Sequence, residues 1–529
     1  MDIRSRAPAP LLGVGRDPAL VLARLQPLDG SAARDAAIAC SGEGLVTGVF
    51  EPGETRGAAR RVLDFRELVI TPGLVDAHTH LVGYGFAMRR LNLAGLTHLA
   101  DVQAAVAARA AELPAGAWVL GGGWDATALG FMSPPLAAWL DAASPRNPVS
   151  LTSRDVHATW ANSVALRVAC LDANTPNPTL GRVVRDASGC PNGAFYESPA
   201  RRLVELAIPA PTAAEYLEAA MTAADDFARR GFVAVHTMAL EEPDALRSIL
   251  ILEAKGTLPL RVWACLGHQD LAAAQNLGLI GGLGARARVG GVKFFSDGSL
   301  GSRTAAFLEP YAGGAQGLWV DDPALIEERS AMAIGLGFTP TVHAIGDAAN
   351  RAVIEVFERL APLARAAGVR LRLEHAQHVH PADIARLKLT GAVASVQPIH
   401  LPGDVPAIRA LLSGEREAQA YPLGALMRAG VPLALGSDAP VVEPTVSGNL
   451  RAACEREDER GLPFHAEQAI SRLEALRAYT FGGAFAAGQE SWSGRIAPGF
   501  LAEFTLWNAD PLTDPTAEPV RALVWPCAE

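Results

Sequence analysis

Two histidines separated by one residue are the first group in this chain whose types and spacing suit chemistry. They lie in Asp76-Ala77-His78-Thr79-His80, directly after Thr71-Pro72-Gly73. Alternate side chains of a β-strand share a face, so His78 and His80 would project together from the end of a strand. Two adjacent imidazoles predict a metal site. For this motif alone, buried or surface histidines without a ligand remain the alternative.

Four further residues extend this pattern, because each ends a strand-like apolar run: Lys293 after Gly-Gly-Val, His343 after Pro-Thr-Val, His375 after Leu-Glu and Asp438 after Leu-Gly-Ser. About one β/α unit separates His343 from His375, and about two separate His375 from Asp438. Imidazoles with a carboxylate suit zinc or a similar divalent ion. A lysine ammonium cannot bind a cation, so Lys293 is a ligand only as the neutral amine or, after reaction with carbon dioxide, as a carbamate. An ordinary lysine paired with Asp297 is the alternative.

The elements that position these residues are predicted to be eight parallel strands. The runs are continuously apolar, as in strands covered on both faces: GLVDAHTH, GFVAVHTM, LRVWACLG, GGVKFFSD, FTPTVHAIG, RLRLEHAQ, GAVASVQP and PLALGSDAP. Helical segments lie between them; residues 351–368 and 381–391 end at Gly368 and Gly391, where a C-terminal cap is expected. The pattern predicts an α/β fold, a (β/α)8 TIM barrel, whose strand ends meet at one mouth.

The domain organisation follows from the gaps between these runs. The gap after the first strand is too long for one crossover, so residues 84–215 are expected to form an inserted subdomain within a barrel of residues 71–494. Residues 1–70 and 495–529 are expected to pair into a small β-rich domain. The segment 38–54 lacks two clean strands around a turn, which leaves the detail of that domain open.

Composition narrows the class of protein and its location. The chain has 529 residues, half of them apolar, and a formal net charge of −10, which argues against a nucleic-acid partner. Its six cysteines are scattered without a C-x-x-C pair, which favours a reducing compartment over a disulfide framework. No apolar run is long enough for a signal peptide or a membrane span, so we expect a cytoplasmic protein without a membrane partner.

From Leu68 to Asp510 the chain resembles the amidohydrolase superfamily, and most closely the branch (amidohydrolase family 3) that holds N-substituted formamide deformylases. The motifs that carry the resemblance are TPGLVDAHTHL, GGGWD, RDVHATWANSVAL, VKFFSDGSLGSRTAAFLEPY, VHAIGDAANRAV, LEHAQHVHPADI, ASVQPIHL, LALGSDAPV and GRIAPGFLAEF. The resemblance implies a metal centre at the barrel mouth, an insertion after the first strand and a β-sandwich-like domain from both chain ends.

The ligand set is likewise implied by the resemblance. His78, His80 and Asp438 would bind the more buried ion, and His343 and His375 a second one. Lys293, if carboxylated, would bridge them. The resemblance implies one or two divalent ions, with zinc as the expected metal. The oligomeric state is left open, a homodimer being one option.

The function expected from these residues is metal-dependent hydrolysis of a non-peptide carbon–nitrogen bond in a small molecule: an amide, an N-substituted formamide or a cyclic amide. A divalent ion lowers the pKa of bound water toward about 7, and Asp438 would shuttle the proton to the leaving nitrogen. Alternatives are a lactone or carbamate hydrolase, an aromatic-amine deaminase and, from another class, a non-catalytic binding protein.

Residues near the predicted mouth complete the set of candidates. We expect His157, Trp124 and Asp125 of the insertion to contact substrate. Arg303 would bind a substrate carboxylate or pair with Glu309, and His400 and Asp404 would line the pocket or serve packing. Asp76 would orient His78 or pack at the strand start. His236 is expected to be a core histidine, and His378 and His380 to start a helix.

Overall fold

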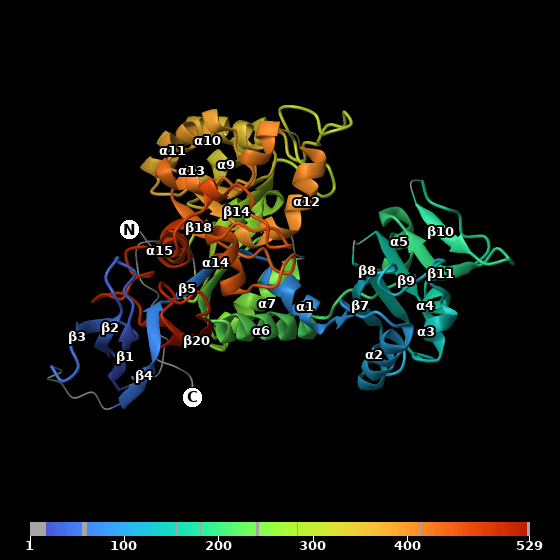
Figure 1. Ribbon diagram of the computed structural model, residues 1–529, viewed down its shortest axis with the longest axis horizontal. Coiled ribbons are helices and arrows are strands. Elements are labelled where there is room, and N and C mark those ends of the chain that lie inside the picture. The colour runs from blue at the N-terminus through green and yellow to red at the C-terminus, as the bar shows by residue number, and fades with distance from the viewer. Residues whose placement is uncertain are drawn as a thin grey trace. The chain divides into compact units, whose positions relative to one another are not determined.

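The computed structural model describes residues 17–54, 61–154, 157–179, 181–239, 243–282, 284–412 and 414–525. The chain forms two compact units. Unit 1 is Met1–Gly85 with Tyr216–Glu529, and unit 2 is Phe86–Glu215. Unit 1 contains the barrel and a separate β-sheet (Figure 1).

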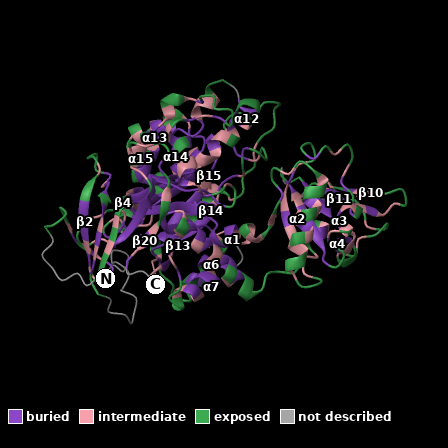
Figure 2. Cartoon of the chain, turned by 60° about the horizontal axis from the view of Figure 1, so that its bottom comes forward, coloured by how far each residue is buried: buried purple, intermediate pink, exposed green. Residues whose placement is uncertain are grey.

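The centre of unit 1 is a sheet of eight parallel strands in sequence order, as the sequence predicts. The strands are β5 (Leu74–Thr79), β12 (Phe232–Thr237), β13 (Arg261–Gly267), β14 (Ala287–Phe295), β15 (Thr339–Ala344), β16 (Arg372–His375), β17 (Val393–Val396) and β18 (Leu433–Leu435). Every residue of β5, β12, β16, β17 and β18 is buried. Figure 2 shows buried strands at the centre of the barrel, around the labelled β14 and β15. Burial on both faces explains why the runs are continuously apolar.

Helices follow the strands and cover the barrel. The longer ones are α1 (Leu81–Arg89), α6 (Ala213–Arg229), α7 (Pro243–Ala254), α9 (Pro323–Gly335), α10 (Asp347–Ala366), α11 (Pro381–Thr390), α12 (Leu401–Leu411) and α14 (Val446–Cys454). The shorter ones are α8 (Leu271–Asn276), α13 (Leu423–Arg428), α15 (Arg472–Arg477) and α16 (Gly483–Ala486). Helix α10 begins four residues before the predicted segment, and α11 ends as predicted at Gly391, whose φ of 76° suits a glycine cap.

The seam between β18 and β5 closes the barrel through the residues that follow β18. The Asp438 amide donates to the His78 carbonyl at 2.7 Å, and the His80 amide donates to the Ala439 carbonyl at 2.8 Å. Gly436 permits this approach, because a Cβ there would lie 2.5 Å from the His78 nitrogen. The seam is therefore made by the backbone of three candidate ligands.

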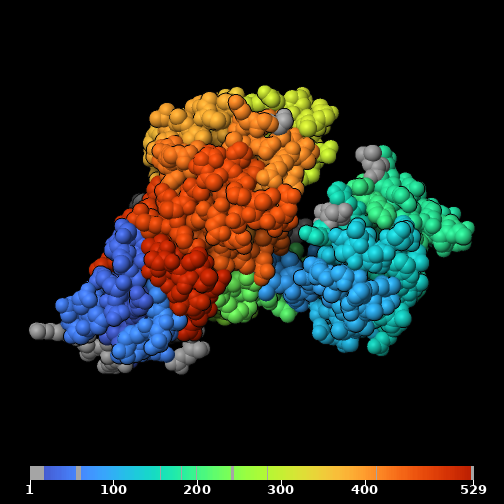
Figure 3. Space-filling view, viewed as in Figure 1, coloured from blue at the N-terminus to red at the C-terminus, as the bar shows by residue number. Residues whose placement is uncertain are grey.

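The two chain ends form one six-stranded sheet in the order β20-β19-β4-β1-β2-β3. Its strands are β1 (Ala19–Leu25), β2 (Arg34–Cys40), β3 (Val46–Phe50), β4 (Arg61–Pro72), β19 (Glu503–Trp507) and β20 (Pro519–Val524). The N-terminal and C-terminal segments adjoin on the surface in Figure 3. Within segment 38–54, β2 and β3 pair as antiparallel strands around a turn, so the departure noted in the sequence does not remove either strand.

Thr505 on β19 fastens this sheet to the base of the barrel. Its hydroxyl accepts the Leu74 amide at 3.0 Å and donates to the Gly231 carbonyl at 2.7 Å. Only Gly73 separates β4 from β5, so one chain segment runs from the outer sheet into the strand that carries His78. The six-stranded sheet thus fixes the N-terminal end of the first barrel strand, β5, through the chain connection at Gly73 and the hydrogen bonds of Thr505.

Unit 2 is a mixed sheet with helices, in the order β10-β11-β9-β8-β7-β6. Its elements are β6 (Leu91–Asn92), α2 (Leu99–Glu112), β7 (Val119–Trp124), α3 (Ala138–Asp141), β8 (Val149–Ser153), β9 (Ala158–Ala161), α4 (Ser163–Val168), β10 (Arg182–Arg185), β11 (Pro191–Tyr196) and α5 (Ser198–Glu205). A core of its own packs around Trp124 and Trp160. In the part of the chain that the structure describes, no helix combines the length and apolar character needed to cross a bilayer.

The Thr505 junction yields a stability prediction. Thr505→Val removes one buried donor and acceptor and leaves the Leu74 amide and the Gly231 carbonyl without their partner. We expect the free energy of unfolding to fall by about 2–4 kcal/mol, measured by urea denaturation followed by circular dichroism. Thr505→Ser keeps the hydroxyl and should retain most of the stability. A Val variant as stable as the native protein would contradict this role.

Candidate metal centre

Four of the six candidate ligands lie in strands, and the other two follow β5 and β18. His78, Lys293, His343 and His375 lie in β5, β14, β15 and β16, while His80 follows β5 and Asp438 follows β18. The ring centroids of His78 and His375 are 4.8 Å apart, and those of His343 and His375 are 4.5 Å apart. The parallel strands therefore bring these histidines together at one end of the barrel.

The tightest group of ligand atoms belongs to His78, His375 and Asp438, which lie within 4.8 Å of one another. His80 adjoins them, with its Nε2 3.2 Å from Asp438 Oδ1. This buried Oδ1 accepts no hydrogen bond with proper geometry from the described residues. A buried carboxylate oxygen left free among imidazole nitrogens fits a divalent cation, and the donor set is one that zinc prefers.

Electrostatics keep these groups in the protonation state that metal ligands need. Burial lowers the pKa of His78 to about 4 and that of His343 to about 3, so both rings are neutral at pH 7. Burial acts to raise the pKa of Asp438, but His78 and the neighbouring histidines hold it well below its usual value. The site thus presents neutral imidazoles and one carboxylate.

A buried carboxylate that the sequence analysis did not single out fixes the orientation of His78. His78 Nδ1 donates to Glu374 Oε2 at 2.6 Å, which leaves Nε2 facing Asp438 Oδ1 at 3.5 Å. The Arg372 Nε donates to Glu374 Oε1 at 2.8 Å, and its guanidinium also donates to the Ala77 carbonyl. Burial acts to raise the pKa of Glu374, but Arg372 and His78 keep it below its usual value, so the carboxylate stays charged.

Asp76, which the sequence suggested as a residue that orients His78, instead accepts backbone hydrogen bonds at the barrel seam. Its Oδ1 accepts the backbone amides of His78 at 3.1 Å and Ser437 at 3.2 Å, so it stabilises the barrel seam and leaves the His78 ring to Glu374. A signal for Glu374 was available in the sequence: Arg372 and Glu374 are charged residues two apart in an otherwise apolar run, which places them on one face of a buried strand.

His375 and His343 are also oriented by neighbouring oxygens. His375 Nδ1 donates to Gln397 Oε1 at 2.8 Å. His343 Nε2 donates to the Gly298 carbonyl at 3.0 Å, which leaves its Nδ1 as the nitrogen able to bind a cation. Hydrogen bonds of this kind select the tautomer of a ligating histidine.

Two of the candidate ligands have strained backbones. His375 has a φ of 68° and Asp438 a φ of 59°, in the left-handed region that side chains with a Cβ seldom adopt. Each of them ends or follows a barrel strand, so the chain turns sharply at the ligand. Strain of this sort is typical of sites whose surroundings hold a functional side chain in place.

Lys293 is buried beside this cluster, with its Nζ 4.9 Å from the centroid of the Phe295 ring. Burial lowers the pKa of Lys293, which favours the neutral amine. The alternative pairing with Asp297 is not found among the described residues: the Asp297 carboxylate instead accepts the backbone amides of Ala306, Ile345 and Gly346.

Of the candidates around the mouth in unit 1, His400 lies near the cluster. Its Nε2 donates to the carbonyl of Ser437, next to Asp438, at 2.9 Å. Arg303 is exposed on the loop after β14 and makes no ion pair with Glu309 in the described part of the chain. Asp404 accepts hydrogen bonds from Gln377 and Tyr421, so it serves the packing of α12. Substrate contacts by His400 and Arg303 stay predictions.

The three candidates from the insertion lie in unit 2. The Trp124 indole is buried in the core of that unit and donates to the Leu151 carbonyl at 2.9 Å. Asp125 Oδ1 accepts the Thr127 amide at 2.8 Å and so caps a turn. His157 is exposed, and its Nδ1 lies 3.0 Å from Glu197 Oε2. These contacts give Trp124 and Asp125 structural roles, and contact with substrate stays a prediction for all three.

Three histidines outside the cluster pack in the core or cap a helix. His236 is a core residue whose Nδ1 accepts from Arg372 at 3.0 Å. His380 caps α11, with its Nδ1 accepting the Ala382 amide. His378 is buried against Phe307, and neither of its ring nitrogens has a hydrogen-bond partner among the described residues.

Comparisons with known proteins extend over nearly the whole chain. The model of the Amidohydrolase family matches residues 61–525. Protein LONG AFTER FAR-RED 3 of Arabidopsis thaliana is 32% identical over 460 residues, covering 84% of this chain and 78% of that protein. The N-substituted formamide deformylase of Arthrobacter pascens is 27% identical over 523 residues, covering 95% of each. The crystal structure of an uncharacterized metal-dependent hydrolase from Pyrococcus furiosus has a TM-score of 0.78 at 26% identity and covers 94% of this chain and 100% of its own.

The contact between Glu374 and His78 predicts an effect on metal affinity. Glu374→Gln keeps the shape but removes the charge that fixes the His78 tautomer, so we expect zinc affinity to fall about 10- to 100-fold. Competition with a chromophoric chelator measures this directly. Glu328→Gln, an exposed glutamate on α9, is the matched control and should leave affinity unchanged. Equal affinities in both variants would refute an orienting role for Glu374.

His378 predicts part of the pH dependence of stability. Burial lowers its pKa to about 3, although the Ile345 carbonyl acts in the opposite direction. A histidine whose pKa is depressed on folding stabilises the protein above pH 6.5, and this contribution is lost as the pH falls from 6.5 toward 3.

His378→Phe keeps a ring against Phe307 and removes the titration. Between pH 7.5 and 5.0 its free energy of unfolding should therefore fall by about 2 kcal/mol less than that of the native protein. Urea denaturation at the two pH values measures the difference. A variant that loses as much stability as the native protein would show that His378 is protonated in the folded state.

Proposed function

Because the chain belongs to the amidohydrolase family, we propose that it hydrolyses a non-peptide carbon–nitrogen bond in a small molecule, with N-substituted formamides as the leading substrate class. The family and the ligand cluster support a metal-dependent hydrolase. The observation that carries the proposal is the convergence of His78, His375 and Asp438 on one point at the barrel end. The substrate class rests on the similarity to a formamide deformylase along 95% of both chains.

The residues that would hold the metal are those of the cluster. His78, His80 and Asp438 suit one divalent ion, for which we propose zinc, and His343 with His375 would hold a second if Lys293 is carboxylated. The lowered pKa of buried Lys293 supports this, since the neutral amine is the form that reacts with carbon dioxide. Such an ion supplies a water of lowered pKa and polarises the substrate carbonyl.

The protein's own groups then direct the proton. Asp438 stays ionised at neutral pH and lies beside His78 and His80, where its carboxylate would accept a proton from the attacking water. It would pass this proton to the leaving nitrogen, so that a C–O bond forms as the C–N bond breaks and the products are a carboxylic acid and an amine.

This mechanism predicts that Asp438→Asn lowers kcat about 10²- to 10⁴-fold, because the amide neither takes up nor releases the proton. Dialysis against a chelator should also abolish turnover, and added zinc should restore it in the native protein. Asp35→Asn, at an exposed position near the start of β2, is the matched control.

The measurements are release of amine and formate from N-substituted formamides, release of amine and carboxylate from other linear amides, and ring opening of cyclic amides to amino acids. Turnover that survives both Asp438→Asn and metal removal would end the proposal. Cleavage of lactones or carbamates, or release of ammonia from aromatic amines, in place of amide cleavage would assign the site to a different bond.

A further inference from the structure

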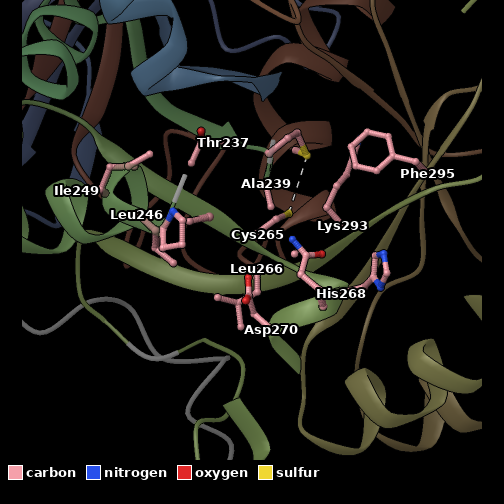
Figure 4. Close-up of a pocket in the computed structure, with 16 residues that line it drawn as sticks. Thr237, Ala239, Leu246, Ile249, Cys265, Leu266, His268, Asp270, Lys293 and Phe295 are labelled. Atoms are coloured by element: carbon pink, nitrogen blue, oxygen red, sulfur yellow. Dashed lines mark hydrogen bonds between the residues drawn. The ribbon is translucent and has the colours of Figure 1, made fainter. Parts of the chain in front are cut away.

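A cavity of about 710 Å³ opens beside Lys293, at the ends of β12, β13 and β14 and against helix α7 (Figure 4). Its volume falls within the range of sites that bind small molecules, about 300–1,000 Å³. All of its described lining residues belong to unit 1.

The wall of this cavity is mainly apolar. The residues Met238, Ala239, Leu246, Ile249, Leu266 and Phe295 contribute hydrocarbon, sulfur or ring surface.

Three of the polar side chains on the same wall, those of Thr237, Cys265 and His268, have other partners. Thr237 Oγ1 accepts the Leu81 amide, and Cys265 Sγ lies 3.9 Å from Met238 Sδ. His268 Nδ1 accepts from Arg329, and its Nε2 lies 3.3 Å from Asp321. Gln269 and Asp270 also line the cavity, but both are exposed, so an occupant meets their polar groups where solvent also reaches. On the rest of the wall it meets few groups able to pair with charge or with hydrogen-bond donors.

The cavity adjoins the candidate metal centre through one candidate ligand, Lys293. Lys293 and Phe295 line it, and the Phe295 ring centroid is 5.5 Å from that of His343, which contacts His375. A molecule whose carbonyl lies at the histidines could thus extend a substituent past Phe295 toward α7.

On the basis of the proposed function, we propose that this cavity receives the apolar N-substituent of the amide substrate, an alkyl chain or an aryl ring. Each methylene group that moves from water into such a cavity strengthens binding about fourfold. A charged substituent would lose its hydration against the apolar part of the wall without gaining a partner there. The cavity therefore selects amides of hydrophobic amines over amides of small or charged amines.

Leu246 is the residue best suited to test this. It lies half-buried on α7 and lines the cavity, as its label in Figure 4 shows, so Leu246→Trp should fill part of the space from the rim. Leu250 lies one turn further along the same helix, is 40% exposed and is not among the lining residues. Leu250→Trp is thus the matched control for a bulky residue on α7.

The experiment compares N-methyl-, N-butyl- and N-hexylformamide as substrates of the full-length protein loaded with zinc. For the native protein and Leu250→Trp, kcat/KM should rise with chain length. In Leu246→Trp we expect a loss of at least tenfold with N-hexylformamide and less than twofold with N-methylformamide. Equal effects on the three substrates, or equal effects of the two variants, would overturn the proposal.

A binding measurement separates this inference from the proposed reaction. Calorimetric titration of N-hexylformamide into the chelator-treated protein should give at least tenfold weaker binding for Leu246→Trp than for Leu250→Trp. If this difference appears while no formamide is cleaved, the apolar site stands and the proposed reaction fails. If formamides are cleaved and binding is the same in both variants, the reaction stands and the apolar site is refuted.

Discussion

The closure of the barrel depends on the backbone of the residues proposed to bind metal. The amide of Asp438 bonds to the carbonyl of His78, and the amide of His80 bonds to the carbonyl that follows Asp438. Asp76 receives amides from both sides of this seam, and Gly436 allows the two segments to touch. The relative positions of the first and last barrel strands therefore set the positions of three candidate ligands, before any ion binds.

Near this seam, Arg372 and Glu374 form a buried network of charged groups. The network would destabilise the fold if one of its members lacked a partner. Arg372 and Glu374 have no solvent exposure, and a lone ion at that depth would be strongly destabilising. The guanidinium is satisfied by Glu374, by the Ala77 carbonyl and by His236, and it lies 4.8 Å from the centroid of the Trp263 ring. The network links β16 to β5 and β12 and fixes one imidazole of the site, so the site is organised by groups that do not bind metal themselves.

The sequence predicts the barrel well because burial on both faces makes each parallel strand a continuous apolar run. All eight predicted runs are barrel strands, and the regularity of βα units places His343 and His375 at the same end. The Gly391 cap was visible for a similar local reason. The sequence also predicts which side chains can bind a metal, because imidazole and carboxylate groups at strand ends are few.

What the sequence does not show are contacts between distant strands. Glu374 and His78 lie 296 positions apart, and only the closed barrel brings them to 2.6 Å. The sequence also does not show that Asp76 accepts a hydrogen bond from the Ser437 amide, because the two residues meet only across the seam of the closed barrel. The contact of the Trp124 indole with the core of unit 2 likewise depends on packing rather than on local sequence, and contact of Trp124 with substrate stays a prediction.

The position of the insertion has a consequence for how such a chain can vary. It interrupts the crossover between β5 and β12, whose two stems, α1 and α6, meet in unit 1: Tyr84 bonds to Asp226 at 2.8 Å, and Gly85 touches the carbonyl of Ala219. Because the contacts between α1 and α6 fix the distance between the two ends of the insertion, the inserted residues affect the barrel in the same way as a loop that joins those ends. Each doubling of a loop's length costs only about 0.6 kcal/mol in closure entropy. Insertions of very different size are thus nearly equivalent for the barrel, and this crossover can diverge while the strands that carry the candidate ligands stay constant.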